Sequence, residues 1–145
     1  MVFLWFLSKS KILTRDNVAK RQALVDTTCL SCSDFESVHH LFFDCVVAKQ
    51  MWLQLVHVVN LNKVYNFEAV AEFWLSERKH VVLNVCGAAA MWSLWKLRNS
   101  LCFQNGRWRG MWQIWRSISI MLKNWELIYP VTWSNTRWCW TSWRS

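Results

Sequence analysis

The 145-residue chain is 54% hydrophobic and 18% charged, which excludes a disordered chain and allows one domain with a buried core. Its formal net charge of +8 points to polyanionic partners. The three glycines and one proline leave few helix breakers, so we expect a mostly α-helical fold.

The N-terminal stretch "MVFLWFL" begins an apolar helix that is predicted over residues 2–12. This stretch is seven residues long and has no basic leader, which favours a core helix over a secretory signal. A fifteen-residue uncharged run over residues 81–95 is shorter than the roughly 20 apolar residues that span a bilayer. We therefore expect an intracellular protein of the nucleus or cytoplasm, not secreted and with no membrane partner, whose cysteines are reduced.

The second and third helices are predicted on either side of a cysteine-rich stretch. The second helix should begin near Thr14, whose side chain can cap free backbone N–H groups, with Asp16 in the positive first turn. From about residue 45 the apolar residues recur mostly on one helical stripe: Val46, Ala48, Met51, Trp52, Leu55, Val56 and Val59. Residues 29–45 are expected to form a compact, turn-rich insertion between these two helices.

The second half of the chain is predicted to be helical as well. A polar loop leads to Asn66, which is expected to cap a short helix, and a long helix follows over about 80–104. Gly106 can take the left-handed conformation that ends helices. Residues 104–129 are assigned to a C-terminal amphipathic helix and residues 130–145 to an irregular tail rich in tryptophan. The apolar stripe of this last helix recurs every three or four residues: Trp112, Trp115, Ile118, Leu122 and Trp125.

The cysteine-rich stretch reads "CLSCSDFESVHHLFFDC" and contains the pattern C-x2-C-x7-H-x4-C. Zn²⁺ prefers four sulfur or nitrogen ligands at tetrahedral corners, and a tight C-x2-C turn directs two thiolates to one point. Three thiolates and one imidazole would fill all four positions, which is typical of a structural site without a reactive water. The alternative is that the thiols are merely buried and both imidazoles lie at the surface.

Two adjacent histidines compete for the fourth ligand position. His40 gives the H-x4-C spacing of a zinc knuckle, whereas His39 gives H-x5-C. His40 also precedes the apolar run "LFF", which is expected to pack inward around the site. We therefore predict His40 as the ligand, with His39 exposed or acting as a partner of a ligand. The predicted zinc ligands are Cys29, Cys32, His40 and Cys45.

Four segments carry a family resemblance: "FLWFLSKSKILTRDNVAKR", "CLSC", "ESVHHLFFDCVVAKQMW" and "WKLRNSLCF". Together they resemble the zinc-binding domain attached to reverse transcriptases of plant LINE-type (non-LTR) retrotransposons. The resemblance is dense over residues 2–55 and thin after 104, and it implies a zinc-binding domain over residues 1–103. It also implies the same four ligands, because the family's histidine directly precedes "LFF". His39 stands where the family usually has an acid and Val46 where it often has proline, but neither departure removes a ligand.

The catalytic signatures of a reverse transcriptase are missing from the sequence. Nucleotide transfer needs paired aspartates that hold two metal ions, and no two aspartates of this chain are adjacent: Asp16, Asp26, Asp34 and Asp44. The sequence has no acidic set that resembles a ribonuclease H site, and no nucleophile motif frames a serine. We therefore expect a module that is not an enzyme.

Positive charge is concentrated in the C-terminal third of the sequence. Residues 96–145 hold eight basic residues and one acidic residue, whereas residues 1–45 hold five of each. Arginine can neutralise phosphates and tryptophan can stack on unpaired bases. The candidate nucleic-acid contacts are Arg107, Trp108, Arg109 and Arg116. The competing interpretation places Trp112 and Trp115 in the core of the last helix and leaves the arginines on its solvated face.

Two functional hypotheses follow from these patterns. The first is a non-catalytic zinc-binding module that binds RNA or single-stranded DNA, with the parent element's reverse transcriptase as a further candidate partner. The second is a helical protein-interaction or relic fragment without a role in nucleic-acid binding.

Overall fold

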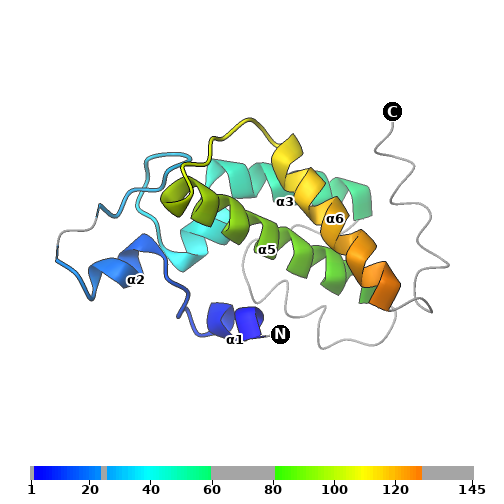
Figure 1. Ribbon diagram of the computed structural model, residues 1–145, viewed down its shortest axis with the longest axis horizontal. Coiled ribbons are helices and arrows are strands. Elements are labelled where there is room, and N and C mark those ends of the chain that lie inside the picture. The colour runs from blue at the N-terminus through cyan, green and yellow to red at the C-terminus, as the bar shows by residue number, and fades with distance from the viewer. Residues whose placement is uncertain (1, 24–25, 60–80, 129–145) are drawn as a thin grey trace.

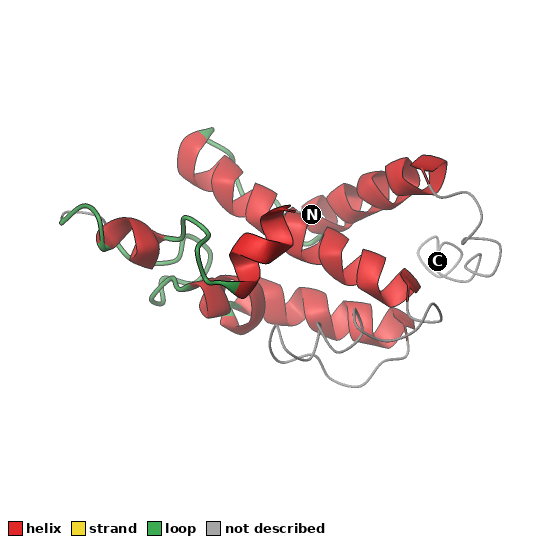
Figure 2. Ribbon diagram, turned by 90° about the horizontal axis from the view of Figure 1, so that it is seen from below, coloured by secondary structure: helices red, strands yellow, loops and turns green. Residues whose placement is uncertain are grey.

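The computed structural model describes residues 2–23, 26–59 and 81–128 (Figure 1). Its helical elements are α1 (Val2–Ser8), α2 (Arg15–Ala19), the π-helical turn η1 (His40–Asp44), α3 (Val46–Val59), α5 (Val81–Phe103) and α6 (Trp112–Ile128). Figure 2 shows helices and loops in the described parts of the chain. The predicted mostly α-helical fold, with a cysteine and histidine cluster inserted between helices, is confirmed. The predicted helix after Asn66 and the tail over residues 130–145 lie outside the described residues.

Helix α5 is the central element of the described fold. It contacts α6, α3 and η1 (Figure 1), and its run from Cys86 to Met91 is buried. A helix that is apolar on all sides is stable only when other elements cover it. The part of the uncharged run from Cys86 to Met91 thus packs in the core, and none of the described helices is long and apolar enough to cross a membrane.

Helix α3 buries one stripe and is joined to η1 by aromatic side chains. The buried residues of this stripe are Val47, Ala48, Met51, Trp52 and Leu55, whereas Val46, predicted on the same stripe, is exposed. The Trp52 Nε1–H donates a 2.6 Å hydrogen bond to the Phe42 carbonyl, and the Trp52 ring stacks on Phe43. These contacts fix the insertion against the core through its "LFF" run, as the sequence predicted.

Two helix ends differ from the predictions. Helix α1 ends at Ser8 rather than near residue 12, and Ser10 takes a positive φ of 51°. At the end of α5 the left-handed residue is Asn105, with φ 50°, so the prediction that Gly106 fills this role is wrong. Gly106 is needed for a different reason. Its N–H donates to the Ser100 carbonyl at 2.9 Å, and an added Cβ would lie 2.9 Å from the same oxygen.

Helix α6 presents to the core most of the face that the tryptophan spacing predicts, since Ile118 is buried and Leu122 and Trp125 pack against the core. Ile114 and Ile118 are buried, and Trp115 is partly buried against the core. Trp112 is 51% exposed, so its predicted place in the core is wrong. One reason is local: the Trp112 Nε1–H donates to the Arg109 carbonyl at 3.2 Å, which holds the ring against the preceding loop.

Candidate metal centre

The C-x2-C turn is closed by backbone hydrogen bonds. The Cys29 N–H donates to the Asp34 carbonyl at 2.6 Å, and the Ser33 N–H donates back to the Cys29 carbonyl at 2.9 Å. Ser33 takes a positive φ of 65°, which lets the chain reverse within a few residues. An isolated antiparallel bridge between Thr28 and Phe35 closes the base of the turn. The turn thereby brings the side chains of Cys29 and Cys32 to one site.

The other half of the site depends on the π-helical turn η1. The Cys45 N–H donates to the His40 carbonyl at 2.7 Å, a hydrogen bond between residues five apart. In an α-helix, residues five apart point about 140° away from each other, because one turn takes 3.6 residues. A π turn is wider and returns residue i+5 to the face of residue i. The H-x4-C spacing therefore brings both side chains to one side of the chain because this turn is π-helical.

The four predicted ligand residues meet at one point. The Sγ atoms of the three cysteines and a ring nitrogen of His40 all lie within 4.8 Å of one another. The sulfurs of Cys29 and Cys45 are 3.8 Å apart, and His40 Nε2 is 3.1 Å from the Cys32 sulfur. Zn–S bonds of about 2.3 Å in tetrahedral geometry put two sulfurs about 3.8 Å apart. The donor set and its spacing therefore fit a zinc ion.

His39 lies outside this cluster. Its side chain is exposed, and its Nδ1 is 2.7 Å from the Asp44 Oδ2. His40, in contrast, is 9% exposed, and its backbone N–H donates to the Ser37 Oγ at 3.0 Å. Among the described residues, the cluster that could hold a metal ion thus includes His40, the predicted ligand, and excludes His39.

The three thiols differ in their tendency to ionise. The pKa of Cys29 is lowered, chiefly because the Cys45 thiol donates a hydrogen bond to it. The same hydrogen bond, together with burial, raises the pKa of Cys45, and burial is the main cause that raises the pKa of Cys32. Each sulfur also has a backbone N–H two residues ahead that lowers its pKa: Ser31, Asp34 and Val47. The cluster therefore holds one favoured thiolate, and a divalent cation would displace protons from the other two thiols.

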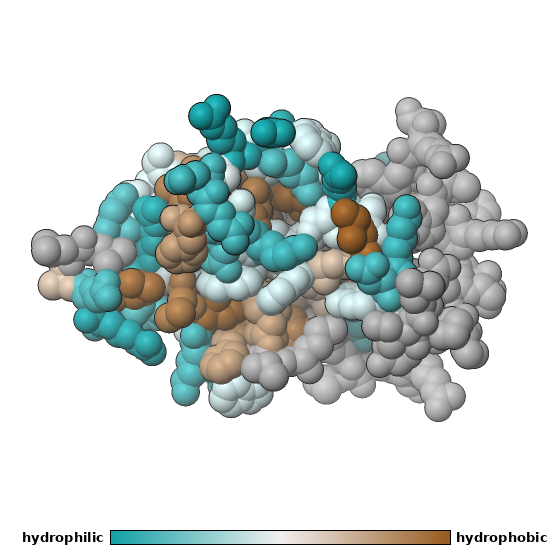
Figure 3. Space-filling model, in the orientation of Figure 1, coloured by the Kyte–Doolittle hydropathy of each residue, from teal (hydrophilic) through white to brown (hydrophobic). Residues whose placement is uncertain are grey.

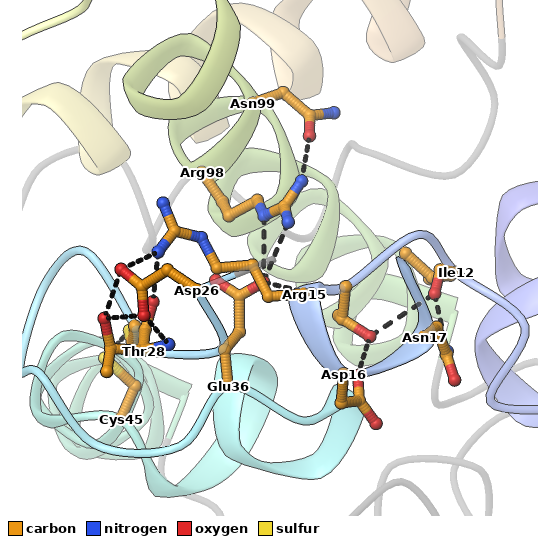
Figure 4. A network of polar contacts seen from close by, with 12 residues as sticks. Ile12, Arg15, Asp16, Asn17, Asp26, Thr28, Glu36, Cys45, Arg98 and Asn99 are labelled. Atoms are coloured by element: carbon orange, nitrogen blue, oxygen red, sulfur yellow. Dashed lines mark hydrogen bonds and ion pairs between the residues drawn. The ribbon is translucent and has the colours of Figure 1, made fainter. Parts of the chain in front are cut away.

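A buried carboxylate beside the cluster joins three elements (Figure 4). Glu36 is completely buried, and its Oε1 accepts hydrogen bonds from Arg98 Nε at 3.1 Å and Nη2 at 2.8 Å. The same oxygen accepts the Arg15 N–H at 2.8 Å, at the start of α2. Thr14 occupies the predicted cap position, but its side chain makes no capping hydrogen bond, so Glu36 supplies the cap instead.

The Glu36–Arg98 pair, which no sequence pattern predicted, connects the metal centre to the end of α5. The two residues are 62 positions apart in the chain. Around them, side chains of the C-x2-C turn and of α5 enclose a cavity of about 20 Å³, which Cys29, Leu97 and Leu101 help to line. Glu36 and Arg98 both lie in segments that carry the family resemblance, and this shared location was the feature of the sequence that could have indicated the pair. The segment that follows the cysteine turn is therefore tied to α5 by an ion pair, and the turn and α5 border the same small cavity.

The predicted nucleic-acid contacts lie where α5 leads into α6. Arg107, Trp108 and Arg109 are exposed on the connecting loop, and Arg116 is exposed one turn into α6. The Gln113 side chain holds this loop, since its Oε1 accepts the Arg109 N–H at 2.9 Å and its Nε2 donates to the Arg107 carbonyl at 3.2 Å. These two hydrogen bonds therefore hold the backbone of the loop in one conformation.

A comparison with known protein families finds a match in the N-terminal part of the chain. Residues 1–52 match the sequence model of a family described as zinc-binding in reverse transcriptase, and this range includes all four clustered residues. No curated protein and no solved structure matches the chain. Together, the family match and the cluster of three cysteines and one histidine support zinc as the cofactor of this part of the chain.

Proposed function

We propose that the chain is a non-catalytic module derived from a plant LINE-type retroelement, and that it binds RNA or single-stranded DNA. Zinc would be held by Cys29, Cys32, His40 and Cys45. It would join the C-x2-C turn to η1 as a structural link, since four protein ligands leave no position for a reacting molecule. This role agrees with the absence of polymerase and ribonuclease H motifs from the sequence.

The observation that carries the proposal is the continuity between the metal centre and the basic loop. The C-x2-C turn borders the same small cavity as Leu97 and Leu101 of α5, and Glu36 holds Arg98 on the same helix. Helix α5 ends at Phe103, and the exposed residues Arg107, Trp108 and Arg109 follow directly. A zinc ion that stabilises the turn would therefore also stabilise the base of this loop.

The loop surface has the chemistry that a single strand requires. Trp108 and Trp112 are exposed rings beside exposed arginines, and the sequence has no acidic residue between 99 and 125. Arginine neutralises backbone phosphates, and tryptophan stacks on unpaired bases without regard to sequence. The Gln113 side chain pre-organises these groups, which lowers the entropy that is lost on binding.

Fluorescence anisotropy with labelled oligouridylate and oligothymidylate tests this proposal. We expect binding that weakens with salt, because counterions are released from each neutralised phosphate. Arg109→Gln should weaken binding and reduce the log–log salt slope by about 0.7. The control Lys49→Gln removes an exposed charge from α3 and should leave the slope unchanged.

Two results would count against nucleic-acid binding. Affinity that does not vary with salt would contradict contacts to phosphate. No binding of either strand, together with oligomers on a sizing column, would favour the protein-interaction alternative.

A further inference from the structure

A second candidate site lies away from the metal centre and away from the α5–α6 loop. It is a pocket of about 370 Å³ between α1, the segment that leads into α2, and α5. Small-molecule sites commonly have volumes of about 300–1,000 Å³. Figure 3 shows apolar side chains gathered over α1 and bordered by hydrophilic ones. The pocket is therefore large enough for a planar ring with one charged group attached.

Aromatic rings form one wall of the pocket: Phe3, Phe6 and Trp95. The Phe3 ring is fixed by edge contacts with Trp92 at 4.9 Å and with Phe42 at 6.2 Å between ring centroids. Trp95 is held by the Arg98 guanidinium, 5.4 Å from its ring. Phe6 is 40% exposed and open to a ligand. The wall is thus a set of rings in fixed positions, which suits stacking on a flat molecule.

Two cations also line the pocket, and neither is neutralised within the described structure. Lys11 and Arg21 both line it and are exposed, and no described residue forms an ion pair with either side chain. The neighbouring cations differ, because Arg15 pairs with Asp26 at 3.1 Å and Lys20 with Asp16 at 3.7 Å. The residues that line the pocket include no acid. An anionic ligand would supply the missing counter-charge.

We propose that this pocket binds one nucleotide of a single strand, with the base against Phe6 and Trp95 and the flanking phosphates at Lys11 and Arg21. The proposal rests on the function proposed above and adds a subsite at the opposite end of the sequence from the basic loop. A peptide bound as an added strand is a poorer fit, because that mode of binding needs backbone hydrogen-bond partners at the site. The side chains that line this pocket are apolar apart from the two cations.

Charge and ring substitutions test the subsite in the full chain. Lys11→Gln/Arg21→Gln is compared with Lys9→Gln/Lys49→Gln, which removes the same charge from exposed positions that do not line the pocket. Anisotropy of labelled oligouridylate should show a salt slope smaller by about 1.4 for the first variant and close to wild type for the second. Phe6→Leu keeps the apolar bulk but removes the ring, and it should weaken binding about 5- to 150-fold.

Zinc content and circular dichroism verify that every variant is folded. A strand that carries 5-iodouracil should crosslink to Phe6 or Trp95 on irradiation. If wild type binds but both double variants bind equally, the pocket assignment is wrong and the proposed function stands. If wild type binds no single strand, both proposals fail. If an acidic peptide rich in phenylalanine binds wild type but not Lys11→Gln/Arg21→Gln, whereas the strand binds both proteins equally, the pocket is a peptide site and the nucleotide assignment is overturned.

Discussion

Arg98→Met should be among the most destabilising substitutions in the described fold. Arg98 is 5% exposed and Glu36 is 0% exposed, so the substitution leaves a buried carboxylate without its cation. Two of the three hydrogen bonds to Glu36 Oε1 disappear, and only the Arg15 N–H remains. Glu36 Oε2 already has no hydrogen-bond partner among the described residues, so none of them compensates. Removal of one partner from a buried pair costs about 3–5 kcal/mol, a large share of the roughly 5–15 kcal/mol that stabilises a typical domain.

Urea denaturation of the zinc-loaded protein, followed by circular dichroism, measures this cost. Arg116→Met is the matched control, since Arg116 is exposed and should change the free energy of unfolding by less than about 0.5 kcal/mol. The double variant Glu36→Leu/Arg98→Met should be more stable than Arg98→Met alone, because no unpaired charge stays buried. A cost below about 1 kcal/mol for Arg98→Met would show that the pair contributes little, and the reasoning from its burial would fail.

Three further predictions concern the core and the thiols. Gly106→Ala should destabilise the fold by about 1–3 kcal/mol in urea denaturation, because a Cβ would crowd the Ser100 backbone at 2.9 Å; an unchanged midpoint would contradict this. Trp52→Phe should cost about 1–3 kcal/mol in the same assay, since the buried Phe42 carbonyl loses its donor. Zinc affinity, measured by competition with a chelator, should fall by about a factor of 100 per pH unit below neutrality. The reason is that two thiols with raised pKa, Cys32 and Cys45, must each release a proton; an affinity independent of pH would refute this.

The metal cluster could be predicted from sequence because its signal is local. Cys29 and Cys32 lie in one tight turn, and His40 and Cys45 are joined by one π turn, so spacing alone limits where their side chains can meet. Burial of the "LFF" run follows from its hydrophobicity in the same way. These features depend on contacts between residues that are close in the chain.

One of the missed features depends on a contact between distant residues, and the other two depend on local backbone geometry that residue spacing does not fix. Thr14 is a sound capping residue by type, but the Glu36 carboxylate reaches the first turn of α2 from 21 positions away. Trp112 fits a helical stripe, yet its indole N–H bonds to the loop and its ring stays exposed. Asn and Gly both adopt the left-handed conformation readily, so the residue types alone allow either Asn105 or Gly106 at the end of α5. In the structure Asn105 is left-handed, and Gly106 lies close to the Ser100 backbone.

The most direct test of the central claim is the zinc content of the purified chain, measured by mass spectrometry of the metal beside the His39→Ala and His40→Ala variants. We predict about one zinc per chain for wild type and for His39→Ala, because His39 points away from the cluster and pairs with Asp44. His40→Ala should lose the metal, since it removes one of four ligands. Full zinc content in His40→Ala, or its loss in His39→Ala, would contradict the assignment.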